Sequence, residues 1–371
     1  GMELYVDGKR VAQRSDVTVG QDYSGFWRVG GDNLSGWSNQ PSSNNFAGTL
    51  DEVSIYPNSL TPSQVQAHYT ASGRSLAIPE APGDAYGRLV YDAAPSVYWR
   101  FDEASGAALK DSGQQGAAGS LDGDYARGAA GAVVGGGSAI TFKKTTCGFW
   151  DFGCKATNGG NGFTTVSERA PGAFSVETWF KTTSTAGGKL IGFGNAQTGS
   201  SSNYDRHVYM DDNGKLSFGT FSTQRNLATS AAAYNDGAWH HVVATQGADG
   251  MVLYVDGVAV GTNPATQAQT YDGYWRVGGD ASWGGTSPNM IGSFDEAAVY
   301  SRALTAPEVA AHFQVGVGAE APNLAPVASY TAVATHLELS VDATGSSDSD
   351  GTIVDYSWNF GDGGTATGVT A

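Results

Sequence analysis

Apolar and polar residues alternate with period two through most of the chain, which is the pattern of half-buried β-strands. In the segment SVETWFKT, Val176 and Phe180 share one face of the expected strand, and Glu177 lies on the other face, toward solvent. The segment MVLYVDGVAV alternates in the same way, and its Asp256–Gly257 dipeptide is a signal for a tight hairpin turn. Strand, turn and strand is therefore the recurring unit of the chain.

Helical signals are found in two short segments. Thr305 and Glu308 form the T-x-x-E pattern of an N-terminal capping box ahead of an apolar run, and Thr61 and Gln64 stand in the same relation. Numerous strands, glycine-rich turns and so few helices predict an all-β fold, namely an antiparallel β-sandwich of jelly-roll type.

An internal repeat relates the two ends of the chain. The repeated pairs are GMELYVDG (1–8) with GMVLYVDG (250–257), FWRVGGD (26–32) with YWRVGGD (274–280), and residues 47–69 with residues 291–313. Residues 1 to about 72 thus duplicate residues 250 to about 316. The second copy has a long upstream partner in this sequence and the first copy has none, so we expect the first copy to be the C-terminal part of a longer domain.

Spacers rich in proline and alanine mark the expected domain boundaries. The expected organisation is a partial domain at 1–74, a linker at 75–84, a complete domain at 85–317, a linker at 318–325 and a partial domain at 326–371. On this interpretation one complete domain is flanked by two incomplete ones, and the sequence is a piece of a longer protein.

Composition and charge exclude several classes of partner. Glycine makes up 53 of 371 residues, about twice its usual share, which suits short strands joined by tight turns. The formal net charge of −16 repels phosphate backbones, so we expect no nucleic-acid partner. No apolar run approaches the roughly 18 residues of a membrane span, so we expect no membrane insertion.

Five motifs resemble those of a known family and follow its order. They are VYWRFDEASG (97–106), AFSVETWFKTTS (173–184), GAWHHVVAT (237–245), LYVDG (253–257) and FDEAAVYSRALTAPEV (294–309). Together they are similar to laminin-G-like, concanavalin A-like jelly-roll domains. The resemblance covers residues 85–317 as a whole domain and residues 1–72 as the C-terminal part of another, and it implies a jelly-roll sandwich.

A different resemblance covers the last segment. Residues 337–363 look like the first half of a PKD domain, an immunoglobulin-like sandwich whose signature here is the WNFGDG that starts at Trp358. Alternation places Val354, Trp358 and Phe360 on one face of the expected strand. Half a sandwich exposes its inner face and a pairing edge, so we expect residues 325–371 to be marginally stable in isolation.

The two cysteines define a short loop rich in aromatic residues. Cys147 and Cys154 lie seven positions apart and favour a local disulfide, which points to an extracellular, secreted or cell-surface protein. The ring that they would close carries Phe149, Trp150 and Phe152. We interpret these aromatic side chains either as a contact platform for sugar or protein, or as a cap folded onto the end of the sandwich.

Patterns of catalytic residues are missing from the sequence. Jelly-roll glycoside hydrolases resembling laminarinases carry E-x-D-x-x-E or E-x-D-x-E on one strand, whereas Asp295–Glu296 is an adjacent pair that a regular strand points to opposite faces. Glu177 is a lone carboxylate, His240 and His241 lack a metal-ligand spacing, and no G-x-S-x-G occurs. We therefore expect this segment not to be an enzyme.

Calcium is the cofactor that the resemblance implies. Laminin-G-like and pentraxin-like sandwiches often hold calcium at one rim, and the corresponding loops here carry Asp280 and Asp151, with Asp32 in the partial copy. Calcium takes roughly six to eight oxygen ligands, so backbone carbonyls and water would supply most of them. Asp295, expected on the apolar face of its strand with Ala297, is either hydrogen-bonded at the rim or a further calcium ligand.

These features predict a non-catalytic extracellular binding or adhesion module within a larger secreted or surface protein. As a hypothesis, Trp150 and Trp283 stack on a glycan while Asp151 and Asp280 bind calcium or sugar hydroxyls. An extracellular protein is the alternative partner. Two other interpretations stay open: accessory modules of a polysaccharide-degrading enzyme or peptidase whose catalytic domain lies elsewhere, and an inert spacer in a surface stalk.

Overall fold

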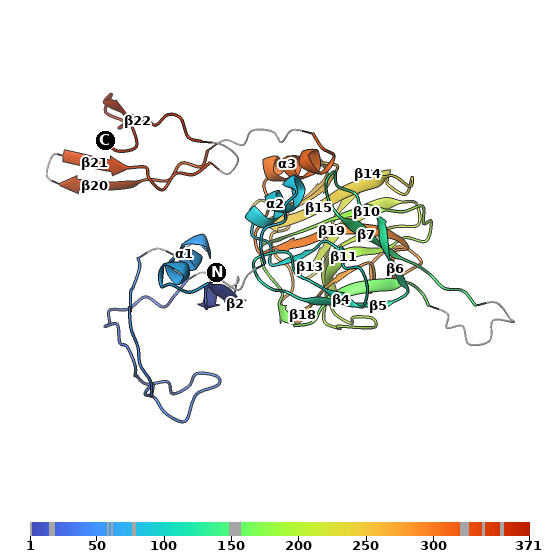
Figure 1. Cartoon of the computed structure of the whole chain (residues 1–371), viewed down its shortest axis with the longest axis horizontal. Coiled ribbons are helices and arrows are strands. Elements are labelled where there is room, and N and C mark those ends of the chain that lie inside the picture. The colour runs from blue at the N-terminus through green and yellow to red at the C-terminus, as the bar shows by residue number, and fades with distance from the viewer. Residues whose placement is uncertain are drawn as a thin grey trace. The chain divides into compact units, whose positions relative to one another are not determined.

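The computed structural model describes residues 2–14, 19–57, 59–60, 62–75, 79–147, 157–319, 326–335, 338–348 and 352–371. The chain divides into two compact units, Gly1–Ala77 and Ile78–Ala371 (Figure 1). Among the described helices, none has the length and apolar composition that a membrane-spanning helix requires.

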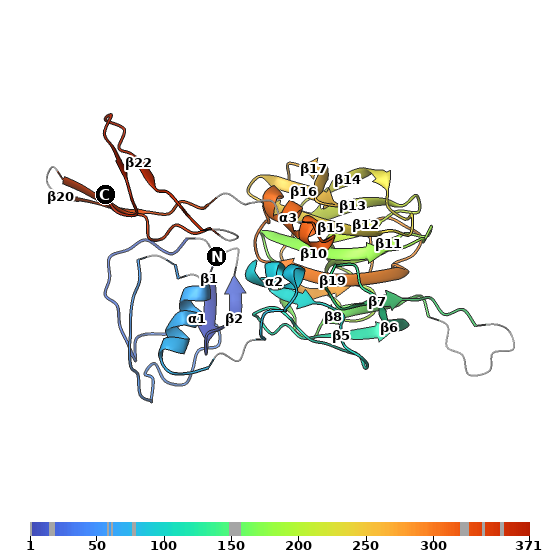
Figure 2. The same ribbon diagram turned by 45° about the horizontal axis from the view of Figure 1, so that its top comes forward.

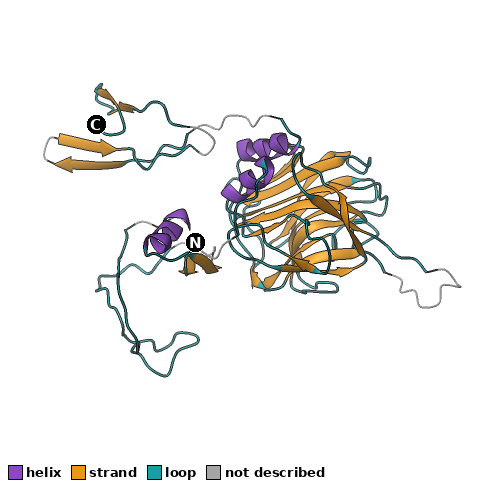
Figure 3. Cartoon of the chain, viewed as in Figure 1, coloured by secondary structure: helices purple, strands orange, loops and turns teal. Residues whose placement is uncertain are grey.

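The N-terminal unit consists mainly of loops. Strands β1 (Met2–Val6) and β2 (Lys9–Arg14) form an antiparallel hairpin, and helix α1 spans Pro62–Ala71 (Figure 3). The hairpin turn at Asp7–Gly8 has positive φ at both residues, 53° and 75°, as a tight two-residue turn requires.

The two copies of the repeat have different structures. Trp27 is 81% exposed, whereas its counterpart Trp275 is 1% exposed in the second unit. Residues 51–56 form a loop, although their counterparts belong to strand β19 (Gly292–Tyr300). Residues 51–56 therefore do not form the strand that their counterparts form in β19, because an apolar strand face needs a second layer to pack against.

Two antiparallel sheets form the sandwich of the second unit (Figures 1 and 3). Across the first sheet the described strands are β17 (Val258–Asn263), β16 (Gly250–Val255), β15 (Trp239–Gly247), β10 (Phe174–Lys181), β19, β7 (Ser138–Phe142) and β6 (Tyr125–Ala130), with β3 (Val97–Trp99) paired to β19. Across the second sheet they are β14 (Arg225–Ala233), β13 (Lys215–Phe221), β12 (Tyr204–Met210), β11 (Gly188–Gly194), β18 (Asp272–Val277), β8 (Gly160–Thr164), β5 (Gly119–Gly123) and β4 (Ala108–Leu109), with β9 (Glu168–Arg169) paired to β18. The predicted all-β sandwich is confirmed.

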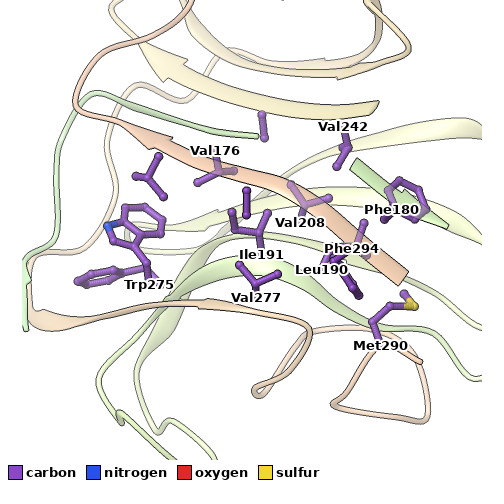
Figure 4. Packing of buried hydrophobic residues seen from close by; sticks show 14 of the residues in the cluster. Val176, Phe180, Leu190, Ile191, Val208, Val242, Trp275, Val277, Met290 and Phe294 are labelled. Atoms are coloured by element: carbon purple, nitrogen blue, oxygen red, sulfur yellow. The ribbon is translucent and has the colours of Figure 1, made fainter. Parts of the chain in front are cut away.

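The main core lies between the two sheets. Val176 and Phe180 of β10 point into it, as the alternation predicts, and meet Leu190, Val208 and Trp275 from the second sheet (Figure 4). These side chains are at most 1% exposed. Burial on this scale is the main stabilising contribution to the sandwich.

Two helices cover the outer face of the first sheet (Figures 1 and 2). Helix α3 (Ala306–Gly316) starts with the predicted capping box, in which the backbone N–H of Thr305 donates to Glu308 at 2.7 Å. Helix α2 (Ala85–Asp92) is not among the predicted elements. Its N-cap Asp84 accepts a hydrogen bond from the backbone N–H of Gly87 at 2.7 Å, a short signal that was available in the sequence.

Glu177 lies beneath these helices, so its predicted solvent-facing position is wrong. Its carboxylate is fully buried and accepts hydrogen bonds from the hydroxyls of Tyr86 (2.7 Å) and Tyr300 (2.6 Å). The ring nitrogens His241 Nε2 and His312 Nδ1 lie 2.8 and 3.0 Å from it. Burial opposes ionisation, but the two histidines hold the pKa of Glu177 well below its usual range. We call these five residues the Glu177 cluster.

A β-bulge places the Asp295–Glu296 pair differently from the prediction. Glu296 has a φ of 50°, and the register of β19 against β10 shifts at this point. Both carboxylates therefore lie on the outer side of the first sheet, and Asp295 does not share the inner face with Ala297. Asp295 accepts hydrogen bonds from the backbone N–H groups of Ala132 (2.8 Å) and Glu296 (3.0 Å), and Glu296 pairs with Arg100 at 2.9 Å.

The C-terminal segment forms two short hairpins. They comprise β20 (Thr331–Thr335) with β21 (Glu338–Asp342), and β22 (Ser357–Asn359) with β23 (Thr365–Thr367). Trp358 packs edge-on against Tyr330, with ring centroids 5.6 Å apart, and lines an open apolar groove of about 580 Å³ with Phe360. Val354 is 94% exposed, so its predicted place on the same face is wrong. Its neighbour Ile353 lines the groove instead.

We predict that Glu177→Gln destabilises the second unit by about 3–5 kcal/mol, because the histidines lose a buried counter-charge and an amide matches fewer donors. The free energy of unfolding in urea measures the change. As a control, Glu80→Gln alters an exposed side chain and should shift it by less than about 0.5 kcal/mol. If Glu177→Gln lowered the free energy of unfolding no more than Glu80→Gln, the Glu177 cluster would contribute nothing to stability.

A second prediction concerns the pH dependence of stability. Burial raises the pKa of Asp295 to about 7, and burial together with Asp295 raises the pKa of Glu296. The folded state therefore holds the Asp295 proton more tightly than the unfolded state, so this contribution to stability falls as the pH rises from about 4 to about 7. Asp295→Asn cannot ionise, and between about pH 5 and pH 8 it should gain roughly 2 kcal/mol relative to the wild type. If the unfolding free energies of the wild type and of Asp295→Asn changed with pH in parallel, this prediction would be wrong.

Candidate functional site

Trp283 lies on the outer face of the second sheet. The loop between β18 and β19 carries it over strands β12 and β13, where its ring centroid is 4.6 Å from that of His207 and 6.3 Å from that of Tyr204. A Cβ at Gly219 would lie 2.7 Å from the indole, so the indole occupies the space that a side chain on β13 would take. Trp283 is half-buried.

A cation lies beside this indole. The guanidinium carbon of Arg225 is 5.0 Å from the centroid of the Trp283 ring, which is the range of a cation–π contact. Arg225 is exposed, and it forms no ion pair with any described residue. Ser217 and Thr229, on neighbouring strands of the same face, join their hydroxyls at 2.9 Å. We call Trp283, Arg225, Tyr204, Ser217 and Thr229 the indole face.

His207 supports the indole face from below. Its side chain is fully buried, and neither ring nitrogen has a hydrogen-bond partner among the described residues. Burial lowers the pKa of His207 well below its usual range, with the nearby charges of Lys189 and Arg225 adding to the effect. The neutral ring thus acts as an aromatic surface for Trp283.

Asp280 lies at the base of the same loop and pairs with a buried lysine. Its carboxylate is 3.1 Å from Lys189 Nζ and 3.6 Å from Arg276, and none of these three side chains is more than 2% exposed. Burial alone would raise the pKa of Asp280, but the two cations lower it. Burial lowers the pKa of Lys189 to about 8, which Asp280 partly offsets. Lys189 Nζ also lies 5.3 Å from the Tyr204 ring, so the ion pair reaches the indole face.

The surroundings of Asp280 do not fit a calcium site. Besides Lys189, the backbone N–H groups of Ser201 (2.8 Å) and Ala281 (2.7 Å) donate to its oxygens. Within the described ranges, no group of three or more His, Cys, Asp or Glu side chains is placed to hold a metal ion. Asp32, in the other unit, is exposed and lies 3.4 Å from Arg28. Asp151 lies outside the described residues, so calcium stays a prediction.

Most of the loop between the two cysteines lies outside the described residues. Cys147 is not a free thiol, and Cys154 lies outside the described residues, so the pairing of these two cysteines remains a prediction. Phe149, Trp150 and Phe152 also lie outside the described residues, so their role as ligand-binding residues remains a prediction. Of the predicted ligand-binding residues, the structure therefore places Trp283 alone.

Sequence reasoning missed the residues around Trp283. His207 and Tyr209 are two positions apart in β12, so period two could have placed them on one face. Gly219 gave no signal, because its role depends on a loop about 60 residues further along the chain. The carboxylate–histidine contact of Glu177 and His241 was also missed, but both side chains are fully buried and serve the fold.

We predict that Asp280→Ala destabilises the second unit by about 3–5 kcal/mol, because it leaves the Lys189 ammonium buried without its partner. The double substitution Lys189→Met/Asp280→Ala should recover a large part of this loss, since no isolated charge remains. Thermal melting measures both. A calcium-dependent rise in the wild-type melting temperature that Asp280→Ala abolishes would contradict the ion-pair role of Asp280.

Comparisons with known proteins agree with this architecture. The family model of the concanavalin A-like lectin/glucanases superfamily matches residues 1–66 and 156–310, and that of the PKD domain matches residues 319–371. No curated protein matches the chain.

Several solved structures are similar at low identity. A native heptameric pentraxin from Limulus polyphemus is 17% identical over 41% of this chain and 74% of its own, with a TM-score of 0.33. Domain 4 of a GH43 extracellular arabinanase from Geobacillus stearothermophilus, in complex with arabinotriose, is 16% identical over 59% and 98%, with a TM-score of 0.40. The CBM40 of a Ruminococcus gnavus sialidase, bound to sialyllactose, is 22% identical over 38% and 83%, with a TM-score of 0.33.

The first family match covers more than half of the chain and includes both copies of the repeat. The superfamily contains lectins and glucanases, so membership alone does not separate binding from catalysis. On its motifs, its two-sheet sandwich and this match, the chain belongs to the concanavalin A-like lectin/glucanases superfamily and continues into a PKD domain.

Proposed function

We propose that the second unit is a non-catalytic glycan-binding module of an extracellular protein, and that it binds sugar on the indole face. The observation that carries this proposal is the half-buried Trp283, held over Gly219 with Arg225 beside it, which pairs with no described carboxylate. The apolar face of a sugar ring packs on an aromatic ring, and donors at the rim of that ring hydrogen-bond the hydroxyls.

The support beneath Trp283 favours a binding role. His207 and Tyr204 contact the indole from the sheet, and the buried Lys189–Asp280 pair anchors the loop that carries it. A side chain held in advance loses little conformational entropy when a ligand binds. Trp283 thus has the rigidity expected of an aromatic anchor.

The polar groups around the indole suit a hydroxylated ligand. Thr229 is exposed and presents its hydroxyl, and Arg225 presents guanidinium N–H groups that no described carboxylate occupies. The proposed binding does not require calcium. A protein ligand would need a larger apolar patch than one indole, which favours the sugar.

The test compares the full chain with its Trp283→Ala variant on an array of neutral and acidic glycans, with and without chelator. We expect the wild type to bind a subset of glycans in both conditions. Loss of the stacking surface should weaken binding about tenfold or more, which corresponds to about 1.4 kcal/mol or more. Titration calorimetry with the best glycan measures the change.

Two further variants make this test specific. Trp283→Phe keeps an aromatic ring and should retain most of the binding, while Trp37→Ala removes an exposed tryptophan of the other unit and should change nothing. If the wild type binds no glycan, the interpretation as an inert spacer gains support. If Trp283→Ala binds as well as the wild type, the indole face is not the site.

A further inference from the structure

A groove of about 650 Å³ opens at a different place on the sandwich. It lies where β7 and β10 end and β19 begins, and the turn after β10 forms one wall. Its lining includes Lys143, Lys144, Lys181, Thr183 and Thr185. No residue of the indole face belongs to this lining, so the groove is a separate feature.

The charge of this groove is opposite to that of the chain. The sequence carries 36 acidic and 20 basic residues, of which eight are lysines, yet three lysines line this one groove and no carboxylate does. Lys143, Lys144 and Lys181 are exposed. None of the three forms an ion pair with a described residue. Three uncompensated ammonium groups around a concave surface create a local positive potential that attracts anions.

Two acidic side chains that lie next to the groove are already engaged. Asp236 precedes Gly237 of the groove, and it accepts hydrogen bonds from His240 (3.2 Å) and from the backbone N–H of Ala238 (2.8 Å). Asp124 accepts a hydrogen bond from the hydroxyl of Thr145. Neither carboxylate pairs with a lysine of the groove, so no ion pair with a described carboxylate cancels the positive charge there.

The groove also offers hydroxyl groups. The hydroxyl of Thr182 donates a hydrogen bond to the carbonyl of Ile291 at 2.6 Å. This bond fixes the turn after β10 to the start of β19. Thr183 and Thr185 follow on this fixed turn, are exposed, and make no hydrogen bond to the described residues. Their hydroxyls are therefore available next to the lysines.

We propose that this groove is a second binding site, specific for a short acidic saccharide that carries carboxylate or sulfate groups. The lysines supply mobile point charges for its anionic groups, and the threonine hydroxyls meet its neutral oxygens. An extended nucleic acid is disfavoured, because its remaining phosphates would run over a surface whose net charge is strongly negative. The site is independent of the indole face.

The experiment titrates the full chain with three probes: a heparin-derived tetrasaccharide, trigalacturonate and neutral maltotetraose. We expect one or both acidic probes to bind and the neutral probe not to bind in this groove. Lys143→Ala/Lys181→Ala should weaken acidic-probe binding about tenfold, since two of three surface charge contacts are lost. Raising NaCl from about 50 mM to about 300 mM should weaken it as well, because salt screens exposed charges.

Matched variants separate this site from the rest of the molecule. Lys215→Ala removes an exposed lysine at the start of β13 and should leave acidic-probe binding unchanged. Trp283→Ala should also leave it unchanged, so a failure here is distinct from a failure of the indole face. Melting curves check that each variant folds. The proposal is overturned if neither acidic probe binds, if the lysine double variant binds both equally well, or if Trp283→Ala abolishes the binding.

Discussion

Strand β10 is buried on both of its faces, and the rest of the second unit is arranged around that constraint. Its inner face belongs to the core between the sheets, and its outer face is closed by α2 and α3. The Glu177 cluster joins both helices to the sheet, since Tyr86 comes from α2, His312 from α3 and His241 from β15. Hydrogen bonds are directional, so this cluster specifies where each helix lies, whereas the surrounding apolar contacts mainly stabilise.

Local sequence signals predicted the local structure well. The Asp256–Gly257 turn joins β16 to β17, and Thr305 caps α3, because each of these signals works through neighbouring backbone groups. Glu177 could not be placed in this way. Alternation indicates that it leaves the inner core, but only the docking of helices distant in sequence decides that the outer face is buried too. The bulge at Glu296 likewise depends on the register against β10.

At the candidate site, too, the local sequence pointed to loop residues but not to their partners from distant segments. Trp283 was predicted as a ligand-facing residue because it lies on a rim loop expected to neighbour the cysteine loop, and the structure leaves this residue partly exposed. Its supports, Gly219 and His207, come from strands that precede the loop by many residues. Asp280 was predicted as a metal ligand because its loop corresponds to the calcium-binding rim of the sandwiches that the domain resembles. Its actual counter-charge, Lys189, lies 91 positions earlier in the chain, and no local pattern links the two.

The position of the two helices determines how the sandwich is connected to its neighbours. Helix α2 is the first element of the second unit and α3 is the last element of its sandwich, and Tyr86 and His312 bring them together with ring centroids 6.3 Å apart. The chain therefore enters and leaves the sandwich on one side, at adjacent points. Trp283 lies on the opposite side, on the outer face of the second sheet. Pulling on both linkers would load the helix-covered face, and the sheet beneath Trp283 would stay outside the line of force.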